Sequence, residues 1–366
     1  MTLRTGKGWA ACYLKVGMLR SQDASSAVIE LKQDGSIVVA VGSVEVGAGT
    51  TTVAAQIAAE ELGVAPESVT VVYGDTDTTP YDGGTVGSRS TYIMGNAVRR
   101  AARDVRDALF QTAAEEFEVS PDDLEVDSGF VRVRGTQDKG IAIGDLAFLT
   151  LYDRRKIVIG RGTFQPETGR VALVGGKSGF RRDATIMDLE TGQGNPVAAF
   201  GYAAAHAEVE VDDETGVVKV RRLIVATDCG RAINPLLLEG QLQGSIVMGI
   251  DHALHEDTRP DCAGDRRLTL DLTEYAISTA LDPPEIISII VECPDPHGPF
   301  GAKGAGEIDV ILPGPAICNA IYDAVGVRLT SLPATPEKIL AGIKQKGGVS
   351  NESVPARSGG SDLGSR

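Results

Sequence analysis

The feature that most constrains the fold is a repeat in the predicted order of secondary structure. Residues 27–46 alternate around an Asp34-Gly35 turn, and residues 204–228 alternate around the turn DDETG, so both segments are predicted β-hairpins. Each hairpin is followed by a glycine-bearing loop, a segment with helical spacing of apolar residues, and a strand. These helices are expected at 51–63 and 233–256, and the strands at 69–76 and 285–292. We therefore expect an α+β fold of two related subdomains that meet at a cleft.

The expected subdomains cover residues 1–155 and 156–345. The remaining residues, 346–366, are polar and rich in glycine and serine, so we expect a disordered tail. Further elements are predicted as a long helix at 91–117, a hairpin at 124–135 and closing helices at 306–326 and 335–345.

Charge and composition exclude several classes of partner. The net charge of −15 repels phosphate backbones and anionic membrane surfaces, so nucleic acid is not an expected partner. Neither an 18-residue apolar run nor a secretory leader is found, which predicts a cytoplasmic protein without membrane insertion. The five cysteines form no CxxC pair, so no zinc or iron-sulfur site is expected in this chain.

Three glycine-bearing loops are the strongest candidates for a binding site. They are VGAGTTT (46–52), GGTVGSRST (83–91) and GAKGAGE (301–307), and each directly precedes a predicted helix. Free N–H groups at a helix start favour anions, so the three loops together suggest one large anionic ligand. The alternative is that the glycines serve turns and the hydroxyls cap helices. None of the loops matches the Walker or Rossmann pattern.

Other polar residues have plainer interpretations. His252 and His255 match no zinc-protease order and are predicted to lie on an ordinary helix surface. Asp228 and Asn234 are predicted to hydrogen-bond the turn and helix start around them. Gln241 lies between Gly240 and Gly244, so from the residues alone either a ligand contact or a surface position is possible.

Glu307 follows a stretch of small residues in GAKGAGE, and two roles are open for it. A glutamate in the first turn of a helix is favourable without any catalysis. Alternatively, the apolar segment ILPGPAI beyond it would desolvate the carboxylate and make it a useful general base. Spacing alone does not choose between these roles.

In chain order, four segments resemble a known family. They are VGSVEVGAGTTT, GDTDTTPYDGGTVGSRST, VATDCGRAINPLLLEGQLQG and GAKGAGEIDVILPGPA. They resemble the second half of the molybdenum-cofactor-binding portion of the xanthine dehydrogenase and aldehyde oxidase family, over most of residues 25–345. The resemblance implies a molybdenum hydroxylase with a molybdopterin cofactor.

The cofactor that this resemblance implies is the molybdenum cofactor in its cytosine dinucleotide form, and the protein itself supplies no ligand to the metal. The resemblance makes Glu307 the general base in hydroxylation of an electron-poor carbon of an N-heterocycle, purine or aldehyde, with water as the oxygen source. One departure is Ala48, where the family commonly has glutamine. The residues implied to bind the cofactor are Gly47, Ala48, Gly49, Thr85, Val86, Gly87, Ser88, Ser90, Gln241, Lys303, Gly304, Ala305 and Gly306.

The resemblance also implies partners. Family members carry a further cofactor-binding half with a GGxFG loop, and some bacterial enzymes, such as nicotinate dehydrogenase, divide the molybdopterin subunit between two polypeptides. We therefore expect a second molybdopterin-binding subunit, an iron-sulfur subunit with [2Fe-2S] clusters and a flavin subunit with FAD, together with a small-molecule substrate. Two alternatives stay open: a reductive member similar to hydroxybenzoyl-CoA reductases, and a non-catalytic structural subunit of such a complex.

Overall fold

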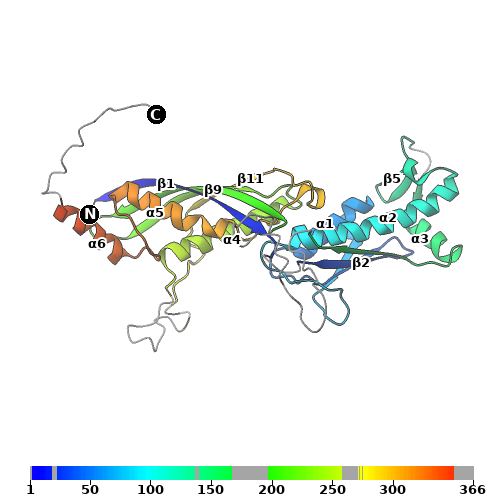
Figure 1. Ribbon diagram of the computed structural model, residues 1–366, viewed down its shortest axis with the longest axis horizontal. Coiled ribbons are helices and arrows are strands. Elements are labelled where there is room, and N and C mark those ends of the chain that lie inside the picture. Colours follow the sequence, from blue (N-terminus) through cyan, green and yellow to red (C-terminus); the bar gives the residue numbers. More distant parts are fainter. Residues whose placement is uncertain are drawn as a thin grey trace, which may run out of the picture.

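The computed structural model describes residues 2–18, 23–136, 140–166, 197–257, 271, 273 and 275–349. Figure 1 shows an elongated molecule in which two mixed α/β parts lie end to end. The α+β class expected from the sequence is confirmed. The tail was expected to be disordered from residue 346, but residues 346–349 form the end of α6. The rest of the expected tail, 350–366, lies outside the described residues. In the described part of the chain, no helix is both long and apolar enough to cross a membrane.

The first part is built on a four-stranded sheet in the order β4-β3-β2-β8. The hairpin predicted around Asp34-Gly35 is present, and Gly35 adopts the left-handed conformation that its turn requires. Helix α1 connects β3 to the parallel strand β4 and ends, as predicted, at Gly63. The elements are β2 (Ser25–Leu31), β3 (Ile37–Val41), α1 (Thr50–Leu62), β4 (Val69–Tyr73), α2 (Gly95–Phe117) and β8 (Val158–Phe164).

A small three-stranded sheet extends this part at the end far from the second part (Figure 1). Its first two strands form the hairpin predicted at 124–135, and its third strand leads directly into a helix. The elements are β5 (Leu124–Asp127), β6 (Phe130–Val133), β7 (Gly140–Ala142) and α3 (Ile143–Tyr152).

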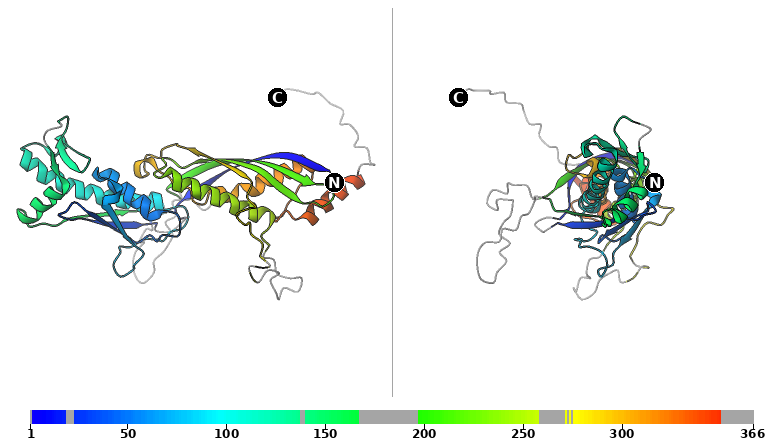
Figure 2. Two further views of the ribbon diagram at one scale, coloured as in Figure 1. Left: turned by 180° about the vertical axis from the view of Figure 1, so that it is seen from behind. Right: turned by 90° about the vertical axis from the view of Figure 1, so that its right-hand side faces the viewer.

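The second part repeats the topology of the first. Its sheet has the order β1-β9-β10-β11, in which the last pair is parallel and the other pairs are antiparallel, as in β8-β2-β3-β4. Figure 2 shows helices gathered along one side of this sheet. The elements are β1 (Leu3–Val16), β9 (Ala199–Asp212), β10 (Val218–Asp228), α4 (Pro235–Leu254), β11 (Glu285–Val291), α5 (Pro313–Val325) and α6 (Pro336–Val349).

The two sheets do not follow the division expected at residue 155. Strand β1, from the start of the chain, pairs along its whole length with β9 of the second part, whereas β8 pairs with β2 of the first part. Strand β1 was not predicted, because its inward positions include Gly6 and Gly8 rather than large apolar residues. A Cβ on Gly8 would lie 2.8 Å from the backbone of Asn319, so only glycine lets α5 pack this closely on the strand.

Two helix boundaries also differ from the prediction. The long helix expected from residue 91 starts with a π-helical turn, Ser90–Met94, before α2 begins at Gly95. The helix expected at 306–326 begins only at Pro313, because a separate 3-10 turn, Asp309–Ile311, precedes it. The other short turns are the 3-10 segments Pro66–Ser68, Pro121–Asp123 and Pro299–Gly301.

Candidate cofactor site

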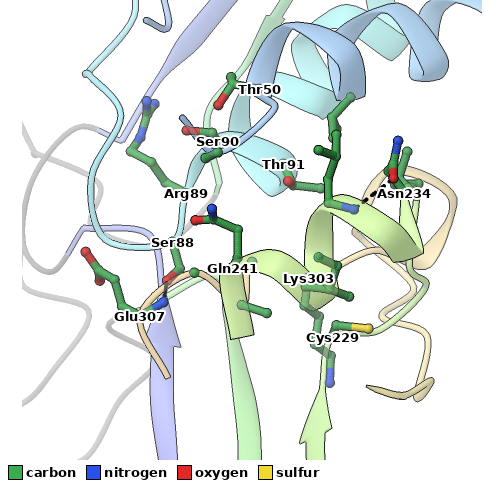
Figure 3. A pocket seen from close by; sticks show the side chains of 18 of the residues that line it. Thr50, Ser88, Arg89, Ser90, Thr91, Cys229, Asn234, Gln241, Lys303 and Glu307 are labelled. Carbon is green, nitrogen blue, oxygen red and sulfur yellow. Dashed lines mark hydrogen bonds between the residues drawn. The ribbon is translucent and has the colours of Figure 1, made fainter. Parts of the chain in front are cut away.

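One cavity lies where the two parts meet, and all three glycine-bearing loops reach it. It is bounded by the segment before α1, the loop before α2, the start of α4 and the loop 303–307 (Figure 3). The cleft expected between the subdomains is therefore present. Of the residues singled out from the sequence, those that line it are Ala48, Thr85, Val86, Ser88, Ser90, Gln241, Lys303, Gly304, Ala305, Gly306 and Glu307.

Three of the expected residues lie next to the cavity without lining it. Gly47 offers its carbonyl oxygen to the Gln241 amide at 3.5 Å, which ties the first loop to α4. Gly49 is the residue that precedes α1, in the left-handed conformation, and Gly87 is also left-handed. These glycines shape the loops through their backbone, as glycine permits.

Glu307 and the second loop hold one another through two hydrogen bonds. The Gly87 N–H donates to Glu307 Oε1 at 3.1 Å, and the Glu307 N–H donates to Ser88 Oγ at 3.1 Å. Ser88 itself has a positive φ of 54°, a conformation that is uncommon for residues with a side chain. Gly304 packs its backbone against Ser88 so tightly that a Cβ there would lie 2.6 Å from the Ser88 carbonyl carbon. The carboxylate is thus positioned by contacts between segments more than 200 residues apart.

Two expectations about the surroundings of Glu307 are wrong. The residue is exposed in this chain, so the apolar segment that follows it does not desolvate the carboxylate. It also lies ahead of α5 and not in its first turn, which removes the interpretation as a helix-start glutamate. The buried carboxylate of this region is instead Asp309, which accepts hydrogen bonds from Thr227 Oγ1 at 2.7 and 2.9 Å. Burial raises the pKa of Asp309 to about 6.

The first loop differs from the expected anion site. The N–H groups of Gly47, Gly49 and Thr51 donate to the side chain of Glu45, at 2.8, 3.0 and 3.2 Å. Burial acts to raise the pKa of Glu45, but the N–H groups outweigh it and the net pKa is lowered. The Glu45 carboxylate therefore satisfies these N–H donors at the start of α1, so they are not free to bind the anionic ligand that was expected there.

Positive charge reaches the cavity from Lys303 and Arg231. Lys303 Nζ bonds Asp228 Oδ2 at 2.7 Å, and Asp228 Oδ1 also accepts the Gly230 N–H, so this carboxylate anchors the loop that leads to Glu307. Arg231 lines the cavity from the loop before α4 and is exposed. A third cation, Arg89, is buried and already paired with Asp23 and Asp82.

The segment DCGRAINP supplies lining residues that were not predicted to bind a ligand. Asp228 and Asn234 make the backbone bonds predicted for them, and Asn234 Oδ1 caps α4 by accepting the Leu237 N–H at 3.0 Å. Asn234 nonetheless also lines the cavity, together with Cys229 and Arg231. The sequence pattern that could have identified them is that this segment, like the other three loops, directly precedes a predicted helix. Thr50 and Thr91 also line the cavity, although neither was predicted to bind the cofactor.

The residues around the cavity fit a polar organic ligand that brings its own metal. Burial raises the pKa of Cys229 to about 11, so its thiol stays protonated and is a poor metal ligand. Among the described residues, no group of three or more His, Cys, Asp or Glu side chains is arranged to hold a metal ion. The hydroxyls of Ser90 and Thr91 and the first N–H groups of their helix can instead bond oxygens of a ligand. A Cβ added to Gly306 would have no atom within 4 Å, so the space beside this backbone is open to a ligand.

These features define a cofactor-binding domain built from two related α/β parts. Residues 2–284 match the molybdopterin cofactor-binding domain family, and the chain belongs to that family. The family resemblance inferred from the four sequence segments is thereby confirmed.

Two named relatives are subunits of a dehydrogenase complex and of a hydroxylase. It is 35% identical over 316 residues to the 6-hydroxypseudooxynicotine dehydrogenase complex subunit gamma of Paenarthrobacter nicotinovorans, covering 86% of this chain and 37% of the relative. It is 32% identical to the nicotine 6-hydroxylase large subunit of the same organism, covering 90% of this chain and 38% of the relative. The chain thus spans less than two-fifths of the length of these relatives.

A solved structure has the same fold. The crystal structure of quinoline 2-oxidoreductase from Pseudomonas putida 86 superposes with a TM-score of 0.82 at 27% sequence identity. The match covers 94% of this chain and 42% of that chain. More than half of that polypeptide therefore lies outside the matched part.

Proposed function

We propose that this chain forms one side of the active site of a molybdenum hydroxylase, with Glu307 as the general base. The observation that carries the proposal is the convergence of Glu307, the Ser88 loop and the start of α4 on one cavity in a chain of this family. The proposed reaction is hydroxylation of an electron-poor carbon with water as the oxygen source. The names of two relatives support N-heterocycles as the substrate class, because nicotine and quinoline are N-heterocycles, and we propose that class over purines and aldehydes.

The cavity residues have separate proposed roles. Ser88, Ser90, Thr91 and the N–H groups at the start of their helix would bond the pterin and phosphate oxygens of the cofactor, and Gln241 would contact it from α4. When bound, the molybdenum cofactor supplies two-electron redox chemistry and a metal that activates water. Glu307 uses Oε1 to accept the Gly87 N–H, which leaves Oε2 able to take a proton. We propose the cytosine dinucleotide form of the cofactor and a cytoplasmic location.

The partner proposal has support from the open side of the cavity. Glu307 is exposed and Val86 is 52% exposed, although a site for proton transfer works best when water is excluded. We propose that a second molybdopterin-binding subunit with a GGxFG loop covers this side. Iron-sulfur and flavin subunits would then carry the electrons away.

The test replaces Glu307 by Gln in the co-expressed complex. We expect the variant to keep about one molybdenum per copy of this chain and to lose at least about 100-fold in turnover of N-heterocycles with an artificial electron acceptor. The matched control is Glu116→Gln, which makes the same carboxylate-to-carboxamide replacement at an exposed position on α2. This variant should leave turnover unaltered.

Each other outcome identifies an alternative. Near-normal turnover by Glu307→Gln would remove the base assignment. A wild-type complex without molybdenum would favour the non-catalytic structural subunit. Consumption of an aryl-CoA thioester with a low-potential electron donor, and no hydroxylation, would favour the reductive alternative.

A further inference from the structure

The sheet of the second part has one apolar face that the described chain leaves uncovered. Helices α4 and α5 lie on the inner face, and within the described part of the chain no helix lies on the opposite side (Figures 1 and 2). We define the outer sheet face by its large apolar side chains. These are Trp9, Tyr13, Tyr202, Ile287, Ile289 and Val291, all of which are exposed.

Strand register shows that these side chains share a face. Trp9 is opposite His206, His206 is opposite Ile224, and Ile224 is opposite Ile287. Directly opposite residues of neighbouring strands point to the same side of a sheet. Tyr13 is likewise opposite Tyr202. One row, Trp9–His206–Ile224–Ile287, therefore crosses all four strands, and the Tyr13–Tyr202 pair lies on the same face beside it.

The exposure is large for residues of this type. Trp9, the single tryptophan of the chain, is 68% exposed, as is Tyr13, and Tyr202 is 56% exposed. Continuous apolar patches of this kind mark interaction sites, and Trp and Tyr are enriched at the centres of protein interfaces.

Charged side chains at one end of the face are already paired with each other. The pairs are Lys7 with Glu208 at 3.2 Å, Arg221 with Glu210 at 2.9 Å and Arg222 with Glu285 at 2.7 Å. This gives the face an apolar centre and a charge-balanced polar rim, which is the usual anatomy of a protein–protein interface. It is a poor match to a nucleic acid or an ionic surface, both of which need unbalanced charge.

At its other end the face continues to the cofactor site. Lys303 Nζ lies 6.0 Å from the centre of the Tyr202 ring, and the Val291 carbonyl oxygen accepts the Cys229 N–H at 3.1 Å. Lys303 and Cys229 both line the cavity. A protein seated on the outer sheet face would thus also reach the edge of the site.

We propose that the outer sheet face is the docking surface for the second molybdopterin-binding subunit, and that docking there covers the open side of the cavity. The occupant follows from the comparisons: more than half of the quinoline 2-oxidoreductase chain lies outside the part matched here, and that remainder shares one polypeptide with the matched fold. The inference rests on the proposed function for the identity of the partner.

The test uses the co-expressed subunit that carries the GGxFG loop and the variant Trp9→Ser/Tyr13→Ser. We expect the Kd of the complex to rise at least about 100-fold, because large aromatic side chains at interface centres carry much of the binding energy. The matched control is Phe148→Ser/Tyr152→Ser, which removes two exposed aromatic side chains, with ring centres 4.3 Å apart, from α3 at the far end of the molecule. Circular dichroism of each variant alone checks that the fold is retained.

A second readout does not depend on substitution. Incorporation of 5-fluorotryptophan into this chain alone places one ¹⁹F label at Trp9, and its resonance should shift when the complex forms. Unchanged affinity of the Trp9→Ser/Tyr13→Ser variant, or an unshifted resonance in the complex, would overturn the proposal. So would a wild-type chain that does not bind this subunit, or a concentration-dependent shift without it, which would identify a second copy as the occupant.

Failure of the proposed function gives a different result. Complex formation through Trp9 and Tyr13 without molybdenum or turnover would refute the hydroxylase assignment and leave the docking surface intact. An active, molybdenum-containing complex that tolerates both serine substitutions would refute only the docking surface.

Discussion

Replacing Gly304 by Ala tests whether the clamp between two distant loops positions Glu307. A Cβ on Gly304 would lie 2.6 Å from the Ser88 carbonyl carbon, whereas carbon atoms pack at about 3.5 Å or more. The Ser88 carbonyl oxygen would lie closer still, so the two loops must separate by more than about 1 Å. Both 3.1 Å hydrogen bonds that join Glu307 to Gly87 and Ser88 would then be broken or stretched.

A displacement of about 1 Å at a catalytic group can cost about 100-fold in rate. We expect a turnover loss of this size in the Gly304→Ala complex, with circular dichroism unchanged. In the chain alone, the Gly87 amide should exchange its hydrogen faster, which reports the lost bond without reference to the cofactor. Gly244→Ala is the control, because no atom lies within 4 Å of that Cβ position on the exposed face of α4. Wild-type exchange at Gly87 together with turnover within threefold of wild type would refute the clamp.

Two further predictions concern buried or capping carboxylates. Burial raises the Asp309 pKa from 3.8 to about 6, so the protonated form stabilises the fold at low pH, and this contribution of up to about 3 kcal/mol is lost as the pH rises through 6. Asp309→Asn should flatten the pH dependence of the free energy of unfolding between pH 4 and 7, measured by urea titration, and an unaltered slope would contradict this. Glu45 has a lowered pKa, so its stabilising effect is present above pH 4.5 and is lost at lower pH. Glu45→Gln should lower the free energy of unfolding by about 1 kcal/mol at pH 7, and equal stability of the two proteins at that pH would show that the cap contributes nothing.

Local patterns predicted much of the fold. The hairpin turn at Asp34-Gly35 and the helix stop at Gly63 depend on backbone conformations that glycine allows, so neighbouring residues determine them. The two-part repeat was visible for the same reason, since hairpin alternation and helical spacing are local signals. The three loops were found because glycines and hydroxyls before a helix form a short, continuous pattern.

Long-range contacts decided what these patterns do not encode. The pairing of β1 with β9, nearly 200 residues away in the chain, depends on α5 packing onto Gly6 and Gly8. The exposure of Glu307 likewise depends on how distant segments pack. The capture of the first loop's N–H groups by Glu45 is different, because it joins residues only two to six positions apart.

By itself, the sequence determined which residues belong to turns, strands, helices and candidate loops, because local backbone preferences set those. Only the tertiary structure decided which loops meet, which carboxylate is buried and which sheet face stays uncovered. The reason is physical: burial and hydrogen bonding between distant segments depend on how whole elements pack, and no short segment contains that information.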